Sequence, residues 1–435
     1  MRNDLTLNLG VRYHLYPSPY EVNGFQAANN VDFQELVDLR ISNAANGILG
    51  AAAEPLTSFN LNGRANNGEP LYATDKNNFA PRLGFAYNPS FEGGVLGALF
   101  GDRKTVLRGN ASVVYDRVGG AVTFIQDQSN FIFDTSVTRQ FGAANARTAL
   151  LNDPRFTGLT SLPVQNVAPD ITRPFTPYVD SNGVPFGLEQ SQTNYVVAKD
   201  FEIPYSYTFN VGMQRELPGN LLLDVTYVGR LGRKLFTQAD AAQTLNFRDA
   251  ASGQFLLDAL NTIQPLVQAN VAANRAPTAG LTPQPWLENQ LNAASLATFG
   301  VHCSGLGQGA NCTEFLTNFQ TDLVRQGGTG DIIQILYANG LLRPNVGISG
   351  QFGLNSYVTN LWSSDYHGGL FSLQKRLSHG FEFELNYTFS HSIDNQSSVV
   401  NTTLGGLLCD VTNTDACRGD SDFDIRHLFN ANYIL

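Results

Sequence analysis

Three aspartates at period-two spacing are the first candidates for chemistry in this sequence. Asp420, Asp422 and Asp424 stand in the stretch CRGDSDFDIRH, and alternate residues of an extended chain share one face. Carboxylate oxygens are the ligands that calcium prefers, so this stretch is a candidate calcium site. The alternative, which we favour, is a solvated acidic loop that leads into a strand.

The four cysteines form two local pairs, Cys303 with Cys312 and Cys409 with Cys417. Neither pair has the C-x-x-C spacing of a zinc site. Both pairs lie in polar stretches that contain Gly and Asn, so we expect two small disulfide loops in an oxidising compartment. Four free buried thiols are the alternative.

Charged side chains also recur on one side of strongly alternating stretches. In FEFELNYTFS, Glu382 and Glu384 alternate with apolar residues, and this pattern predicts a strand with one apolar and one polar face. In a membrane barrel the polar face lines the lumen, where charges tune what passes or hold a plug in place. The predicted lumen-facing residues are Arg12, Arg82, Arg108, Asp224, Arg376, Glu382 and Glu384.

The elements that position these residues are about eight strands, each near the ten residues that a tilted transmembrane strand needs. Their connections alternate between short and long, as expected for a barrel with short periplasmic turns and long extracellular loops. We therefore predict an all-β fold, an antiparallel transmembrane β-barrel that spans 1–435 as a single, partial domain. The long loops are predicted at 16–78, 117–203, 231–365 and 392–422.

Two stretches inside the third long loop, 252–275 and 313–326, have helical spacing. They are consistent with short helical caps on a barrel or with a separate inserted helical subdomain. The Asn, Gly and Pro content of the long loops favours irregular surface structure.

Composition excludes several classes of function. The net charge is −10 and there is no basic patch, so nucleic acid is not an expected partner. The sequence contains no nucleophile elbow, P-loop, HExxH or dinucleotide-binding motif, and its six histidines are scattered. We expect neither an enzyme nor a cofactor.

Six stretches together resemble successive barrel segments of TonB-dependent transporters of the Oar-like type, which are frequent in acidobacteria. They are LTLNLGVRY, NFAPRLGFAYNP, KTVLRGNASVVYDR, PYSYTFNVGMQRELPGNLLLDVTYVGRLGRKL, SLQKRLSHGFEFELNYTFSHSID and DFDIRHLFNANYIL. The resemblance covers nearly all predicted strands in the order of the family. It implies a barrel of the plugged class in the outer membrane of a Gram-negative bacterium, with lipid, the TonB complex and a small-molecule, oligosaccharide or peptide ligand as partners.

The resemblance also implies parts that this chain does not contain. A signal peptide, a carboxypeptidase-regulatory-like domain and a plug would precede it, and the contact with the TonB complex would run through that plug. Family barrels end on a strand with a terminal aromatic residue, whereas this chain ends at Leu435. We therefore expect an internal barrel fragment for energised uptake. The alternatives are a small passive, porin-like barrel and a surface adhesin.

Overall fold

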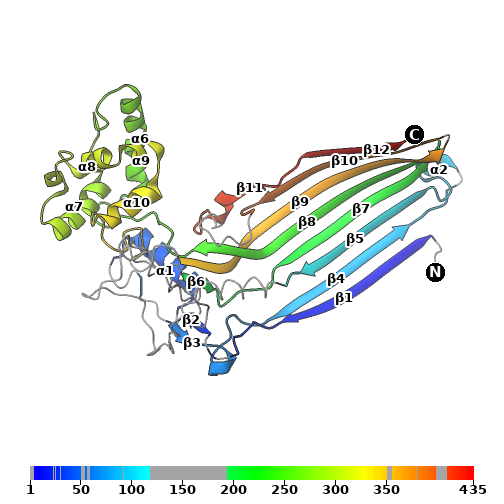
Figure 1. Ribbon diagram of the computed structural model, residues 1–435, viewed down its shortest axis with the longest axis horizontal. Coiled ribbons are helices and arrows are strands. Elements are labelled where there is room, and N and C mark those ends of the chain that lie inside the picture. Colours follow the sequence, from blue (N-terminus) through cyan, green and yellow to red (C-terminus); the bar gives the residue numbers. More distant parts are fainter. Residues whose placement is uncertain are drawn as a thin grey trace, which may run out of the picture.

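The computed structural model (Figure 1) is a long antiparallel sheet that bears loops and a group of helices at one end. It describes residues 4–117 with gaps at 23, 25, 30, 50–53, 56–58 and 92, and residues 194–349, 355–378, 380–397 and 409–435. Most of the predicted loop 117–203 therefore lies outside the described residues. No helix among the described residues is both long and apolar enough to cross a membrane.

Eight long strands build the sheet, which confirms the predicted fold class. They are β1 (Leu5–Tyr16), β4 (Asp75–Tyr87), β5 (Thr105–Tyr115), β7 (Tyr205–Leu217), β8 (Leu221–Asp240), β9 (Asn355–Ser378), β10 (Phe381–Asp394) and β12 (His427–Ile434). They neighbour one another in chain order, and every pair between them is antiparallel. Two short strands join this sheet: β6 (Asn194–Val197) runs parallel to β9, and β11 (Gly419–Asp420) pairs with β10. Within the described residues β1 does not pair with β12, so the sheet is open.

Short and long connections lie at opposite ends of the sheet (Figure 1). The turn from β7 to β8 needs only three residues, because Gly219 and Asn220 adopt left-handed backbone angles, with φ of 84° and 61°. Gly380, with φ of 76°, does the same between β9 and β10. The connection from β4 to β5 holds a short helix, α2 (Gly94–Phe100). The predicted alternation of short and long connections thus matches the observed topology.

The third long connection is shorter than predicted because β8 and β9 continue past the predicted limits of 231 and 365. They remain paired up to Asp240 and Ser356. The register shifts twice between Gly232 and Thr237, and Lys234 has a left-handed φ of 51°. A bulge of this kind puts the side-chain alternation out of phase, so a strict period of two no longer identified the strand.

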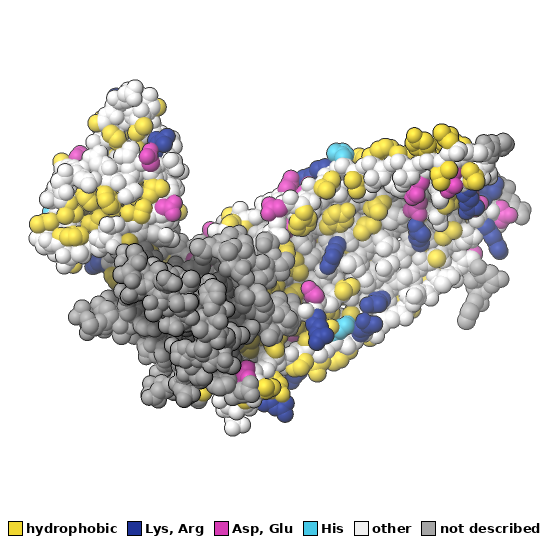
Figure 2. All heavy atoms as spheres, in the orientation of Figure 1, with side chains coloured by type: hydrophobic (Ala, Val, Ile, Leu, Met, Phe, Trp, Pro, Cys, Tyr) yellow, Lys and Arg dark blue, Asp and Glu magenta, His cyan; other side chains and the backbone are white. Residues whose placement is uncertain are grey.

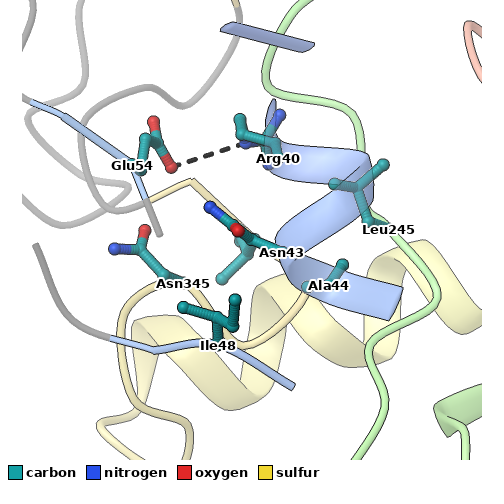
Figure 3. Close-up of a pocket in the computed structure, with 9 residues that line it drawn as sticks. Arg40, Asn43, Ala44, Ile48, Glu54, Leu245 and Asn345 are labelled. Carbon is teal, nitrogen blue, oxygen red and sulfur yellow. Dashed lines mark ion pairs between the residues drawn. The ribbon is translucent and has the colours of Figure 1, made fainter. Parts of the chain in front are cut away.

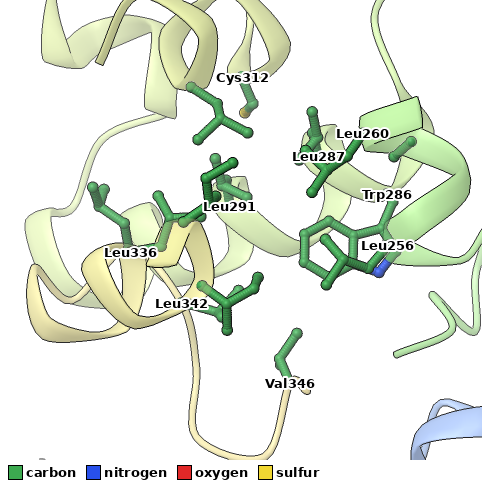
Figure 4. Close-up of a cluster of buried hydrophobic side chains, with 14 of the residues drawn as sticks. Leu256, Leu260, Trp286, Leu287, Leu291, Cys312, Leu336, Leu342 and Val346 are labelled. Carbon is green, nitrogen blue, oxygen red and sulfur yellow. The ribbon is translucent and has the colours of Figure 1, made fainter. Parts of the chain in front are cut away.

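Residues 241–349 form a helical subdomain with its own core. Its helices are α6 (Leu256–Ala272), α7 (Pro285–Phe299), η3 (Cys303–Leu306), α8 (Cys312–Phe319), α9 (Thr321–Gln326) and α10 (Thr329–Ala338). Trp286 is fully buried at the centre, where its indole Nε1 donates to the carbonyl of Phe247 at 2.9 Å (Figure 4). Of the two possibilities for the helical stretches, the structure shows the inserted subdomain. The predicted helix 313–326 is broken at Gln320, whose φ of −136° is not helical.

The first long connection contains a helix that links the sheet to the subdomain. Helix α1 (Phe33–Asn46) is capped by the Asp32 side chain, which accepts from the backbone of Gln34 and Glu35. Its first half packs on the end of the sheet that bears the long connections, and Ala44 joins the core of the subdomain. The same connection holds the pair β2 (Ala27–Asn29) and β3 (Phe59–Leu61) and a single turn, η1 (Arg64–Asn66). A further turn, η5 (Thr414–Cys417), lies in the last long connection.

Candidate functional site

The cross-strand register brings the predicted lumen-facing charges onto one face of the sheet, which we call the polar face. Asp224 is aligned with Ser372 and Ser372 with Asn386, and residues aligned in this way project to the same side. The same alignment and the period of two assign seven charged residues to this face: Arg12, Arg82, Arg108, Asp224, Arg376, Glu382 and Glu384. Figure 2 shows charged side chains scattered over the sheet between uncoloured polar ones.

One ion pair joins two of these seven residues within the described part of the chain. Arg108 on β5 pairs with Asp224 on β8 across the intervening strand β7. Asp224 also accepts from the hydroxyl of Thr226 at 2.8 Å, and Glu384 accepts from the amide of Asn386 at 3.0 Å. The seven residues of the polar face are therefore dispersed charges of both signs, and within the described part of the chain they do not converge on one point.

The opposite face, which we call the apolar face, exposes large hydrophobic side chains over the whole sheet. Leu7, Val211 and Phe429 are 60%, 53% and 63% exposed, and they lie on β1, β7 and β12. The three hydrophobic clusters of the described residues include strand residues only near the ends that meet the long connections. No second protein layer among the described residues covers this face. Such extensive apolar exposure is typical of an interaction surface.

Charged residues set the height of the apolar face. On β9, Lys375 and Asp365 lie on this side, ten positions apart, since they are aligned with Leu221 and Leu231. At about 3.3 Å per residue and a strand tilt of about 40°, the band between them is about 25 Å tall, which is the height of the lipid-facing band of an outer-membrane barrel. Lys375 turns its ammonium toward the nearby turn, where it donates to the carbonyl of Phe381 at 2.9 Å.

The structure also reveals tyrosine–histidine pairs on the apolar face, which were not predicted. The hydroxyl of Tyr227 lies 2.7 Å from Nδ1 of His367, and that of Tyr387 lies 2.8 Å from Nδ1 of His427. The two tyrosines are separated by 160 positions in two similar hairpins, and this repeat is the feature of the sequence that could have indicated a shared role for them. Their histidine partners come from other strands at unrelated spacing, so the sequence could not supply the pairs.

The stretch that holds the candidate calcium ligands does not stay extended, because the chain turns after Ser421. The backbone amide of Asp424 donates to the carbonyl of Ser421 at 2.8 Å. Asp420 and Asp424 converge with His391, without Asp422. The guanidinium of Arg426 contacts both carboxylates, at 3.1 and 2.6 Å. The arginine thus already offsets the charges of both carboxylates. This arrangement fits the interpretation that we favour, a solvated acidic loop that leads into a strand, and the calcium site stays an untested candidate.

Both predicted cysteine pairs are joined as disulfides in the structure. Cys303 bonds to Cys312 inside the subdomain core, and Cys409 bonds to Cys417 in the last long connection. Glu288 and His302 lie close to the first disulfide. Glu288 caps the start of α8, where it accepts from the backbone amide of Thr313 at 2.9 Å. These side chains therefore hold the start of α8 against η3 and α7.

A second polar centre of the subdomain surrounds Asp249, which is 2% exposed. Burial by itself raises the pKa of this carboxyl, but hydrogen bonds from Ser252, Asn289 and Gln290 outweigh burial and hold the pKa below its usual value. The carboxylate therefore joins the start of the subdomain to helix α7. No local pattern pointed to this carboxylate, since its partners lie 3, 40 and 41 positions away.

Comparison with known proteins agrees with this geometry. The family model of the outer membrane beta barrel domain matches residues 1–435, so the chain belongs to that family. Together with the fold, this membership supports an outer-membrane location. Among curated proteins, none matches the chain.

Similar solved structures include a hemophore receptor and two outer-membrane proteins. The hemophore receptor HasR of Serratia marcescens, solved with its hemophore and heme, is 10% identical, with 99% of this chain and 37% of that chain covered and a TM-score of 0.29. The outer membrane transporter YddB of Escherichia coli is 9% identical, with 79% and 22% covered and a TM-score of 0.27. The alcaligin receptor FauA of Bordetella pertussis is 7% identical, with 87% and 29% covered and a TM-score of 0.24. The chain thus spans between 22% and 37% of the length of these structures.

Proposed function

We propose that this chain is a barrel segment of an Oar-like, TonB-dependent transporter that takes up a substrate across the outer membrane. The apolar face contacts lipid, and the polar face lines the lumen. The helical subdomain and the long connections lie on the extracellular side, and the three short connections lie in the periplasm.

The observation that supports this proposal best is the exposed apolar band of about 25 Å on a sheet whose other face is polar. In a water-soluble sandwich the apolar face would pack against a second layer. Here the buried clusters lie at the end of the sheet that bears the long connections. Lipid is the environment in which such a band is stable.

The polar face supports a role as a lumen wall. Both signs of charge occur on this face, with Arg12, Arg82 and Arg376 beside the acidic pair Glu382 and Glu384. Such a surface can bind a polar plug through dispersed hydrogen bonds and ion pairs that exchange with water. In the proposed mechanism the TonB complex pulls on that plug, and a path opens along this wall. We expect the substrate to be an oligosaccharide, a peptide or a metal chelate.

The open sheet argues against the small passive barrel. Closure of eight strands would require β1 to pair with β12, whereas β1 pairs with β4 and β12 pairs with β10 in the described residues. An open edge in lipid leaves unsatisfied backbone groups, each at a cost of several kcal/mol. Additional strands would therefore complete the barrel.

Orientation is tested by labelling intact cells with a membrane-impermeant maleimide. Gln308→Cys in the subdomain is expected to react on intact cells, and Gly219→Cys in the short turn only after permeabilisation. The reverse pattern would overturn the proposed orientation.

Transport is tested with radiolabelled oligosaccharides, peptides and ferric chelates in cells with and without the gene. Energised uptake stops when a protonophore collapses the proton gradient, whereas a passive pore keeps working. Protonophore-insensitive uptake would favour the porin-like alternative, and binding of cells to a surface without any uptake would favour the adhesin.

A further inference from the structure

The helical subdomain is attached to the sheet by two chain segments, and its base is held by side chains from two other connections. Residues 241–249 lead into the subdomain, and 341–349 lead out of it. The two segments contact each other where the backbone amide of Leu245 donates to the carbonyl of Gly347 at 2.7 Å. Neither segment forms a strand or helix, so the subdomain needs other contacts to hold a fixed orientation.

The first contact comes from helix α1 (Figure 3). Arg40 is 5% exposed, and its guanidinium donates to the carbonyls of Ala241 and Gln243 at the start of the subdomain. Its Nε lies 3.4 Å from the carboxylate of Glu54, whose side chain is 2% exposed. Glu54 in turn accepts from the hydroxyl of Ser349 at the end of the subdomain. One buried ion pair therefore reaches both ends of the subdomain.

The second contact comes from the disulfide loop 409–417. The side-chain amide of Gln243 donates to Asp410 at 2.8 Å, and its carbonyl oxygen accepts from the backbone amide of Val411 at 2.8 Å. The disulfide shapes this loop, since the backbone amide of Asp410 lies 3.2 Å from the sulfur of Cys417. The side-chain amide of Gln243 is thus bonded to the disulfide loop, and its main-chain carbonyl is bonded to Arg40.

We propose that Arg40, Glu54, Gln243 and Asp410 form a latch that fixes the orientation of the helical subdomain. The Cys409–Cys417 cross-link holds the loop side of this latch, so that a chain without this cross-link leaves the subdomain free to move as one body. The core of the subdomain supports motion as a body, because among the described residues Ala44 is its one buried member from outside 241–349, with Ile41 and Leu49 packed against it. For such motion, the buried polar bonds of Arg40, Glu54 and Gln243 at the base have to break. This device does not depend on which substrate is transported or on whether transport is energised.

The two disulfides allow a matched test by hydrogen-exchange mass spectrometry on the protein in detergent micelles. In the variant C409S/C417S we expect exchange at 241–249 and at 409–412 to rise on the order of tenfold, since the two hydrogen bonds from the Gln243 side chain to the loop are lost. Exchange in α6 and α7 is expected to stay at the wild-type level. The control variant C303S/C312S opens the disulfide inside the subdomain, and its effect is expected at η3 and α8 without a change at 241–249.

A second variant, Gln243→Leu, removes the two hydrogen bonds between this side chain and the loop and keeps both disulfides. It is expected to reproduce the faster exchange at 241–249 with α6 and α7 still protected. Unchanged exchange at 241–249 in Gln243→Leu would overturn the proposal. Equal loss of protection in α6 would overturn it too, because the subdomain would then unfold instead of moving as a body.

Discussion

An arginine in the middle of the apolar band should disrupt membrane assembly, and the register identifies the position. Val225 on β8 is aligned with Phe371 on β9. It lies close to halfway between Leu221 and Leu231, which are aligned with the charged limits Lys375 and Asp365. An arginine at the midplane of the lipid-facing surface costs about 2–4 kcal/mol. Val225→Arg should therefore lower the equilibrium constant for folding and insertion by about 30- to 1,000-fold.

The adjacent residue provides the control. Thr226 projects to the polar face, where its hydroxyl donates to Asp224, so Thr226→Arg should cost less than about 1 kcal/mol. Assembly is measured as heat-modifiable, protease-resistant protein in outer-membrane fractions, and the free energy is measured by urea titration of protein refolded in lipid vesicles. Equal tolerance of the two arginines, or greater damage from Thr226→Arg, would show that the faces are assigned the wrong way round.

Three further outcomes follow from the helical subdomain and the polar face. Residues 241–349 expressed alone should give a cooperative, helical thermal transition by circular dichroism, because the subdomain buries its own core; a non-cooperative melt would contradict this. Because hydrogen bonds depress the pKa of Asp249, its stabilisation should be complete above the ordinary Asp value of about 4 and should be lost as the pH falls through the lower, folded value. Asp249→Asn should cost about 1–3 kcal/mol at pH 7 and flatten that acid dependence in thermal melts from pH 7 to pH 2. Arg108→Ala should change the free energy of unfolding in vesicles by less than about 1 kcal/mol, because water screens its ion pair with Asp224. The Arg108 side chain is 49% exposed and that of Asp224 is 20% exposed. A loss above about 2 kcal/mol would point to a structural role.

The strands could be predicted from the sequence because a membrane sheet imposes the same local rule on every residue. Lipid on one side and water on the other force a period of two, and the period survives wherever the ladder is regular. The stretch FEFEL shows the rule at its clearest, and the structure aligns Glu384 with Gln374 on one face and Leu385 with Leu373 on the other. The rule fails at the two register shifts between Gly232 and Thr237, where first β8 and then β9 contains an extra residue, and an extra residue moves the side chains that follow it to the other face of the strand.

The long connections could not be predicted in the same way, because their structure depends on partners far away in the sequence. Arg40 meets Gln243 across 203 positions, and Ser349 meets Glu54 across 295. Helix α1 did have local signals, an N-cap at Asp32 and a left-handed Gly47 at its end. They were missed because the stretch 16–78 was treated as one irregular loop. The turn after Ser421 could not be predicted either, and it is the reason why the three aspartates do not follow one extended chain.

The chain therefore combines two kinds of stability in one fold. The sheet has its hydrophobic surface outside and requires lipid, as Leu7 and Phe429 show by their exposure. The helical subdomain has its hydrophobic surface inside, around Trp286, and requires only water. Among the described residues, the two parts meet in a small apolar junction, where Ala241 and Ala242 of the subdomain pack with Tyr357 of β9 and with helix α1. Specific polar contacts at the same junction add to this packing, and the buried pair of Arg40 and Glu54 is one of them.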